Sequence, residues 1–331
     1  MSDLTTSYLG LELKHPIVNG ASPLTKSVDN VKKLEDSGVS AIVMHSVFEE
    51  QLKKENELMD EFLFYGDVNN PEASNYFPNY DEYDLGPEEY LDQIRKIKSS
   101  VDVPVFASLN GYSSGGWVDY AKQIEGAGAD ALELNIYYLA TNPDQDAATV
   151  EKQYLDVVKA IRNSVTIPIA VKLSPFFSAP ANMIKKMSNA GANAFILFNR
   201  FYQPEINVND ITVETKLHLS TSLEKNLAMR WIALLYGRVQ TDFAASTGIH
   251  SVEDVAQMLL AGASITQVVS VLLKTDLSWV NKTVQGLQNW MDEHEFLSIK
   301  ELQGSISQQK CSEPAAFERA NYMKTLMSYT S

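Results

Sequence analysis

Cysteine is nearly absent from this sequence, since Cys311 is the only one among 331 residues. One thiol cannot form a disulfide, a zinc ribbon or a cysteine-ligated iron–sulfur cluster within the chain. Any redox chemistry must therefore use a bound cofactor or other side chains.

Positive charge is scarce as well. The chain has 27 lysines and arginines against 42 aspartates and glutamates, which gives a formal net charge of −15 and a pI of about 4.8. Such a surface repels both a nucleic-acid backbone and anionic lipids. We therefore expect a small-molecule substrate, and neither nucleic acid nor a membrane as partner.

Long apolar runs are also missing, although apolar residues make up 45% of the chain and suffice for a core. The opening MSDLTTSYLG lacks the basic and apolar regions of a signal peptide, and no other stretch is apolar for the length that a bilayer requires. We expect a globular, cytoplasmic protein.

Several catalytic motifs do not occur. There is no HExxH or similar metal spacing, and Glu133, which could face a barrel lumen, has no second acid to form a glycosidase pair. The GAGADA segment follows a predicted helix and precedes a strand, the reverse of the order in a dinucleotide fingerprint. We expect neither a metal site nor NAD binding.

The sequence does contain a regular alternation of strands and helices. Eight β-rich runs are predicted strands: Pro16–Asn19, Ala41–Ser46, Pro104–Asn110, Ala131–Ile136, Pro168–Ser174, Ala194–Asn199, Thr241–Thr247 and Ile265–Ser270. Amphipathic stretches between them are predicted helices and include Val28–Ser37, Glu88–Ser99, Trp117–Gly126, Thr149–Asn163, Ala181–Asn189 and Val252–Leu260. The alternation predicts parallel strands joined by crossover helices.

Two internal sequence repeats favour a closed barrel over an open sheet. The segments SGVSA, AGADA, AGANA and AGASI place Gly38, Gly128, Gly191 and Gly262 between a helix end and every second strand, and SVDVPVFASL resembles SVTIPIAVKL. This period predicts an α/β fold of the (β/α)8 TIM-barrel class, in which the glycines end helices. We expect the barrel to span residues 1–292, and a C-terminal extension over 293–331 to pack on it or trail from it.

Three connections depart from the repeat. The long loops Glu49–Gly86 and Arg200–Lys225 follow strands at the C-terminal face, where barrels build active sites. The second loop contains INVNDITVETKLHLS, whose partial alternation predicts a hairpin lid. The N-terminal YLGLELKHP predicts another hairpin, which would plug the bottom of the barrel.

Lys172 is the most informative residue at a strand end. A lysine in the apolar strand IPIAVKLS must face the lumen or its mouth, where a lone ammonium is costly and needs an anionic partner. The partner could be the negative charge of a reduced flavin. Two alternatives are a Schiff-base lysine, as in barrel aldolases, and a lysine paired with a core acid.

A phosphate site is predicted beyond the last two strands. Ser246, Thr247 and Gly248 lie between a strand and a helix that opens near Ser251, and Ser270 ends the last strand. The alternative is an ordinary capped turn. Because the small residues at 20–22 would let a planar ring approach the backbone, the combination favours a flat cofactor that carries phosphate.

The segments LGLELKHPIVNGAS, ELNI, VKLSP and STGIHSVEDVAQMLLAGASITQVVSVLL together resemble the dihydroorotate dehydrogenase family of FMN enzymes, from about Leu9 to about Leu273. The resemblance implies FMN as cofactor and a homodimer. With the strand-end residues, it gives the expected FMN-binding set Gly20, Ala21, Ser22, Ser46, Ser108, Asn135, Lys172, Asn199, Ser246, Thr247, Gly248 and Ser270.

The chain departs from the family where the substrate would react. Where class 1 members read Thr-Lys-Ser, it reads Met44-His45-Ser46, and the family's Cys or Ser base is replaced within Ile136-Tyr137-Tyr138-Leu139-Ala140. A tyrosine hydroxyl can transfer the proton that accompanies hydride transfer, so we expect Tyr138, or Tyr137, in this role. Packing of these tyrosines under the lid is the alternative.

These observations predict an FMN-dependent oxidoreductase that acts on a carbon–carbon bond next to a carbonyl. Its expected catalytic residues are Tyr138, Lys172 and His45, and its expected substrate-binding residues are His45, Asn110, Asn135, Asn199 and Arg200. Conversion of dihydroorotate to orotate in pyrimidine biosynthesis, with an altered base, is the provisional assignment. The alternatives are a paralogue that reduces another activated alkene, an aldolase that uses Lys172 as a Schiff base, and a flavin-binding protein without turnover.

Overall fold

The structure, a computed structural model, describes residues 1–49, 51, 86–111, 117–200, 202–318, 322 and 326–328. Its centre is a sheet of eight parallel strands: β3 (Ile17–Asn19), β4 (Ile42–Phe48), β5 (Val105–Gly111), β6 (Ala131–Ile136), β7 (Ile169–Leu173), β8 (Ala194–Leu197), β11 (Asp242–Ser246) and β12 (Ile265–Val268). They coincide with the predicted strands to within a few residues. The expected loop Glu49–Gly86 lies almost entirely outside the described residues.

The sheet is a nearly closed barrel, as the (β/α)8 prediction requires. Ladders join the strands in the order β3-β12-β11-β8-β7-β6-β5-β4. Across the remaining junction, the Asn19 Nδ2 donates to the Val43 carbonyl at 2.8 Å and its Oδ1 accepts from the Val43 N–H at 3.3 Å. Because an asparagine amide carries the same donor and acceptor as a peptide group, it replaces the missing ladder between β3 and β4.

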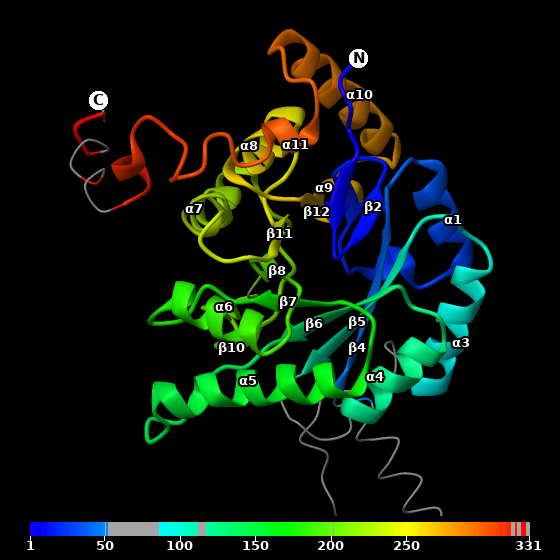
Figure 1. Ribbon diagram of the computed structural model, residues 1–331. Helices are drawn as coiled ribbons and strands as arrows, with labels where there is room; N and C mark the ends of the chain where they lie inside the picture. Colours follow the sequence, from blue (N-terminus) through cyan, green and yellow to red (C-terminus); the bar gives the residue numbers. More distant parts are fainter. Residues whose placement is uncertain are drawn as a thin grey trace, which may run out of the picture.

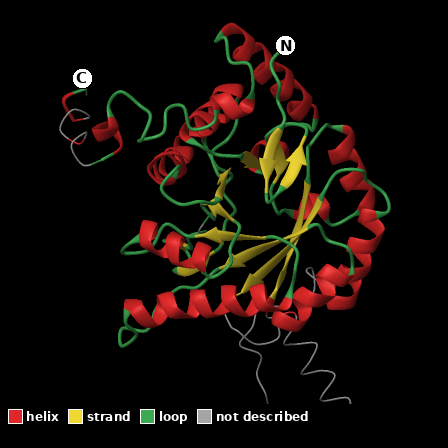
Figure 2. Ribbon diagram, viewed as in Figure 1, coloured by secondary structure: helices red, strands yellow, loops and turns green. Residues whose placement is uncertain are grey.

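Helices surround the strands (Figures 1 and 2). The longer ones are α1 (Val28–Asp36), α3 (Pro87–Lys98), α4 (Trp117–Gly126), α5 (Ala147–Ser164), α6 (Pro180–Asn189), α7 (Lys225–Leu235), α8 (Val252–Ala261) and α10 (Ser278–Glu293). The short ones are η1 (Pro23–Thr25), η2 (Ser222–Glu224), α9 (Ser270–Lys274), α11 (Ile299–Leu302) and η3 (Pro314–Phe317). All six predicted helices are confirmed. No helix within these described stretches is long and apolar enough to cross a membrane.

Local signals explain where the helices begin and end. Ser27 and Asp146 accept hydrogen bonds from backbone N–H groups at the starts of α1 and α5, and Ser251 forms a capping box with Asp254 on α8. The four repeated glycines all have positive φ, between 93° and 126°. This left-handed backbone favours glycine and confirms that these residues end helices.

Both predicted hairpins are present. Strands β1 (Thr6–Tyr8) and β2 (Leu11–Leu13) pair antiparallel, and the Tyr8 ring lies 6.2 Å from the Phe106 ring inside the barrel. This hairpin fills the N-terminal end, as expected. Strands β9 (Glu205–Asn207) and β10 (Thr212–Glu214) form the second hairpin, within the segment predicted to be a lid.

Alternate side chains of each strand face the lumen and fill it in layers, of which the lower are apolar and the upper polar. The lower layers are packed by a cluster from the strand starts and the plug hairpin: Tyr8, Leu9, Leu13, Val18, Ala41, Val43, Phe106, Ala131, Ala170, Ala194, Ile196, Ala244 and Ile265. Two residues further along the strands, polar side chains replace apolar ones, as at Ser108, Glu133 and Lys172. The chemistry of the barrel is therefore confined to its C-terminal mouth.

The C-terminal extension contacts the outer helices. The backbone N–H groups of Gly304, Ile306 and Gln308 donate to carbonyls of Leu259, Leu260 and Ala233, on α8 and α7. The described part of the extension packs on the barrel at least as far as Phe317, which contacts the apolar core outside the strands.

Candidate functional site

A buried polar network crosses the mouth of the lumen. Glu133 on β6 accepts from Lys172 Nζ on β7 at 3.2 Å and from Gln267 Nε2 on β12 at 2.7 Å. All three side chains are at least nine-tenths buried. Because a buried charge is costly unless it is paired, the carboxylate and the ammonium stabilise each other here.

This network bears on the three alternatives for Lys172. The lysine is paired with a core acid, and that acid is Glu133, the residue noted in the sequence for its place within a strand. A carboxylate at 3.2 Å is a partner for an ammonium, whereas a Schiff-base lysine reacts as the free amine. An ammonium has three donors, and Glu133 accepts one of them, so the pairing is compatible with a second, anionic partner at the mouth.

The neighbouring strand ends bring several predicted site residues together. Asn199 Nδ2 donates to Asn135 Oδ1 at 2.9 Å, and the hydroxyls of Ser46 and Ser108 lie 2.8 Å apart. In the ladders, Asn110 is opposite Asn135, and Asn135 is opposite Lys172. The expected cofactor-binding and substrate-binding amides therefore lie close together, with Asn110 on β5, Asn135 on β6 and Asn199 just after β8.

Gly20, just after β3, brings bare backbone to the mouth of the barrel, in close contact with Val269. A Cβ on Gly20 would lie 2.8 Å from Val269 Cγ2 and 3.8 Å from Gln267 Oε1. Gln267 Oε1 and Ser22 Oγ are buried and have no hydrogen-bond partner within the described residues. A planar heteroaromatic ring beside Gly20 would offer hydrogen-bond donors and acceptors to these two atoms. The residues present fit a flavin ring.

The predicted phosphate residues meet at Ser220, which the sequence interpretation missed. The Ser220 hydroxyl accepts from the Gly248 N–H at 3.3 Å, and the Ser220 N–H donates to Ser270 Oγ at 3.1 Å. Lys274 Nζ donates to the Ser220 carbonyl at 2.7 Å, and His250 Nε2 lies 3.1 Å from its hydroxyl. Backbone N–H groups, hydroxyls and a lysine, the kinds of group that bind phosphate, are thus gathered around Ser220 and bonded to one another.

Gly248 allows this convergence. Its φ is +79°, and a Cβ there would lie 2.4 Å from the Lys225 backbone nitrogen. Lys225 in turn pairs with Asp254 at 3.0 Å, and Asp254 accepts from the N–H groups of His250 and Ser251. The base of the lid segment is thereby tied to the turn after β11.

His45 occupies an irregular place at the rim. The β4–β5 ladder shifts register between Val43 and Ser46, so that Met44 and His45 form a bulge. The ring of His45 packs edge-on against Tyr90 of α3, with centroids 5.2 Å apart. Burial, with a smaller effect of nearby Lys26, lowers the pKa of His45 to about 4, and its Nδ1 is buried without a hydrogen-bond partner within the described chain. His45 is thus a neutral imidazole at pH 7.

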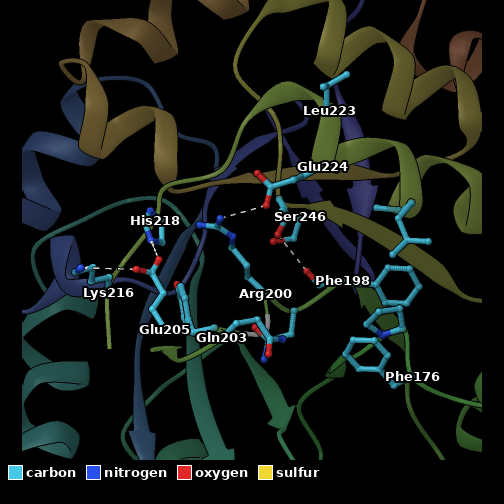
Figure 3. Close-up of a pocket in the computed structure, with 16 residues that line it drawn as sticks. Phe176, Phe198, Arg200, Gln203, Glu205, Lys216, His218, Leu223, Glu224 and Ser246 are labelled. Atoms are coloured by element: carbon cyan, nitrogen blue, oxygen red, sulfur yellow. Dashed lines mark hydrogen bonds and ion pairs between the residues drawn. The ribbon is translucent and has the colours of Figure 1, made fainter. Parts of the chain in front are cut away.

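A cavity of about 560 Å³ lies under the lid and beside the mouth (Figure 3). Its apolar wall includes Phe176 and Phe198, and its lining also contains Asn199, Ser246 and Thr247 from strand ends. Lid residues line the opposite side: Arg200, Tyr202, Gln203, Glu205, Lys216 and His218. The hairpin segment therefore borders a ligand-sized space, as expected for a lid.

Charged pairs organise the lid side of this cavity (Figure 3). Arg200 pairs with Glu224 at 3.2 Å, and Glu205 contacts both Lys216 and His218. Arg200, predicted to bind substrate, therefore lies in the wall of the cavity, with a carboxylate that holds its guanidinium in place.

The model of the dihydroorotate dehydrogenase family matches residues 3–291 of this chain. A catalytic subunit named dihydroorotate dehydrogenase B (NAD(+)), from Thermoplasma acidophilum, is 24% identical over 92% of this chain and 99% of its own length. A putative dihydroorotate dehydrogenase A (fumarate) from Aeropyrum pernix is 25% identical over 91% and 97%. The NAD-dependent dihydropyrimidine dehydrogenase subunit PreA of Escherichia coli is 23% identical over 91% of this chain and 76% of its own length.

Proposed function

The chain belongs to the dihydroorotate dehydrogenase family, a family of flavin-dependent oxidoreductases. We propose that it binds FMN at the barrel mouth and transfers a hydride to or from the β-carbon of a carbonyl compound. The observation that carries this proposal is the buried Lys172–Glu133–Gln267 network beside Gly20. A bound flavin supplies the two-electron chemistry that no side chain of this protein supplies.

Each part of the mouth has a role in this proposal. Gly20, Ala21 and Ser22 would lie along the ring, and Ser46, Ser108, Asn135 and Asn199 would surround it. Ser246, Thr247, Gly248 and Ser270 would hold the phosphate, together with Ser220 and Lys274. Lys172 would stabilise the negative charge that develops on the ring during hydride uptake. FMN rather than FAD is proposed because the expected phosphate residues Ser246, Thr247 and Gly248 form a single turn, at the end of β11.

We propose that the substrate side of the site departs from the family pattern, as the sequence predicts. Asn110, Asn135 and Asn199 are proposed to hold polar groups of the substrate, and His45 and Arg200 to contact its carbonyl. The proton carrier is proposed to be one of the two tyrosines after β6, Tyr137 and Tyr138. Tyrosine has an ordinary pKa of about 10, so it is a poor base but an adequate acid at neutral pH.

This acid–base preference bears on the reaction. Oxidation of dihydroorotate needs a base, whereas reduction of an activated alkene needs an acid. The names of the relatives already cover more than one substrate, since both dihydroorotate and dihydropyrimidines occur among them. We propose that dihydroorotate is at most a slow substrate at pH 7 and that an alkene conjugated to a carbonyl is reduced faster.

A homodimer is part of the proposal. The lid hairpin exposes four β-branched apolar side chains, each at least 70% accessible: Ile206, Val208, Ile211 and Val213. Exposed apolar side chains clustered on one hairpin are typical of a protein–protein contact. The cytoplasmic location expected from the sequence stays a prediction.

The deciding experiment is inspection of the purified protein. We expect a yellow protein whose visible spectrum is that of a flavin and whose heat-released cofactor is FMN by chromatography. Colourless protein that fails to bind added FMN would contradict the proposal. Bound FMN that no alkene reoxidises after reduction would instead indicate a flavin-binding protein without turnover.

A further inference from the structure

Two adjacent tyrosines follow strand β6, and the alternation of that strand separates their surroundings. Glu133 and Asn135 bond on the lumen side of the sheet, to Lys172 on the neighbouring strand β7 and to Asn199 after β8 respectively. Leu134 and Ile136 instead belong to the apolar core outside the strands. Because successive side chains on an extended chain point to opposite sides, the residue after Ile136 is the next one on the lumen side.

Tyr137 has the surroundings that this alternation predicts. It is half-buried, and its hydroxyl is close enough to Tyr202 for the two phenols to interact electrostatically. Tyr202 lines the cavity beside the mouth together with Asn199 and Arg200, and the Arg200 guanidinium lies 5.8 Å from the centre of the Tyr202 ring. Tyr137 is therefore on the side of the loop that faces the lid.

Tyr138 is held on the other side. Its hydroxyl donates to Gln145 Oε1 at 2.7 Å, and its ring packs against the apolar core outside the barrel strands. The hydroxyl of Tyr154 on α5 hydrogen-bonds the Tyr138 backbone. These contacts fix Tyr138 between β6 and α5, away from the row formed by Glu133 and Asn135.

We propose that Tyr137, and not Tyr138, is the proton donor of this site. The proposal rests on the flavin-dependent function proposed above. It differs from residue-by-residue comparison with the family motif, in which the position of the Cys or Ser base falls on Tyr138.

The step balances as follows for an alkene conjugated to a carbonyl. A bound flavin, reduced beforehand by dithionite, would supply a hydride with its two electrons: the flavin N–H bond would break, a C–H bond would form at the β-carbon, the carbon–carbon π bond would break and the flavin would be oxidised. The Tyr137 O–H bond breaks as a C–H bond forms at the α-carbon. The phenolate then regains a proton from water, so that two electrons and two protons are added to the substrate.

The surroundings of Tyr137 suit donation rather than abstraction. Burial, with a smaller effect of Tyr202, raises the pKa of Tyr137 above its ordinary value. The hydroxyl consequently stays protonated at neutral pH and is available as an acid.

The test compares Tyr137→Phe with its matched neighbour Tyr138→Phe in FMN-loaded, full-length protein. Each protein is reduced with dithionite without oxygen and mixed with 2-cyclohexenone in a stopped-flow instrument, and flavin absorbance is followed. We expect Tyr137→Phe to slow reoxidation by about a hundredfold or more. Tyr138→Phe should reoxidise close to the wild-type rate.

A second readout separates loss of the donor from loss of structure. Reoxidation by dioxygen needs no proton delivered to carbon, so both variants should keep the wild-type rate with oxygen and the wild-type FMN content. Slow reoxidation by cyclohexenone in Tyr138→Phe alone, or wild-type rates in both variants, would overturn the assignment while leaving the flavin function intact. Absence of bound FMN in the wild type would instead remove the proposed function, and this inference with it.

Discussion

Glu133 Oε1 lies 3.2 Å from Lys172 Nζ, and both side chains are buried in the lumen of the barrel. The charge that a flavin would meet at this mouth is therefore that of a compensated pair rather than of a lone ammonium. Two separate predictions follow from this ion pair, one for Lys172 and one for Glu133.

Replacing Lys172 by Ala should slow flavin reduction by substrate far more than it weakens FMN retention. The reason is that negative charge on the ring develops during hydride uptake, so the ammonium stabilises the transition state more than the bound oxidised cofactor. Stopped-flow reduction rates and FMN dissociation constants measure the two effects. Equal losses in both quantities would make Lys172 a binding residue only.

Replacing Glu133 by Gln should raise the reduction potential of the bound flavin. Glutamine keeps the shape and an acceptor for Lys172, but it removes the negative charge that offsets the ammonium, so the reduced, anionic ring is favoured. We expect the ratio of reduced to oxidised flavin to rise at least tenfold at a fixed potential, which is about 30 mV for two electrons. Equilibration with a reference dye measures it.

A double-mutant cycle supplies the control for Glu133. In a Lys172→Met background, the same Glu133→Gln change removes the carboxylate when no ammonium is present for it to neutralise. The part of the shift in reduction potential that depends on Lys172 is then absent. The shift in the double variant should therefore differ from that in the single variant. Identical shifts in both backgrounds would show that Glu133 does not act through Lys172.

Whether a feature could be predicted from the sequence depends on how far apart its interacting residues lie along the chain. The strands and helices were predicted because their signals are local, such as the run IPIAVKLS or the capping serine at Ser251. The roles of Glu133 and Ser220 were missed because their partners are remote: Gln267 is 134 positions from Glu133, and Ser270 is 50 positions from Ser220. No local pattern encodes such pairs.

His45 and the two tyrosines illustrate a second limit. Sequence comparison places residues along a strand, but a bulge or a turn decides which way each side chain points. The shift between Val43 and Ser46 adds a residue to β4. One added residue reverses the alternation, so the neighbours of His45 could not be inferred from its position.

Stability should fall as the pH falls through the range of histidine titration. Burial lowers the pKa of His15 and of His45 from 6.5 to about 4. Between these values the unfolded chain binds protons that the folded protein does not, so the contribution is fully present above pH 6.5 and is lost as the pH falls to about 4. Each histidine should contribute at most about 3 kcal/mol. Thermal unfolding from pH 7.5 to 4 measures this.

The matched variant for this pH dependence is His15→Gln. The His15 ring bridges the Gly38 carbonyl and the Ile17 N–H, so neutral glutamine can keep part of that bridge without titrating. The variant should lose less stability than the wild type between pH 6.5 and 4, whatever its stability at pH 7.5. Parallel curves for the two proteins would contradict the assignment to His15.

The lid hairpin should be required for dimer formation. Ile211 and Val213 are 87% and 71% exposed, and a carboxylate at either position would be buried without a partner in an apolar contact. We expect the combined Ile211→Glu and Val213→Glu variant to be a folded monomer by light scattering at concentrations where the wild type is a dimer. Leu297→Glu, at a site 77% exposed outside the hairpin, is the control and should leave the dimer unchanged.

Gly248 provides the sharpest test of the proposed phosphate turn, because two independent features disfavour a side chain there. Its φ of +79° is strained for any other residue, and a Cβ would lie 2.4 Å from the Lys225 backbone nitrogen, an atom that no side-chain rotation can move. Gly248→Ala should therefore cost about 2 kcal/mol or more and release FMN. Gly126→Ala, whose added Cβ meets no atom within 4 Å, is the control and should retain both stability and cofactor. A Gly248→Ala protein that binds FMN as tightly as the wild type would place the phosphate elsewhere, because the backbone shift needed to admit the methyl group would displace the N–H that Gly248 presents to Ser220.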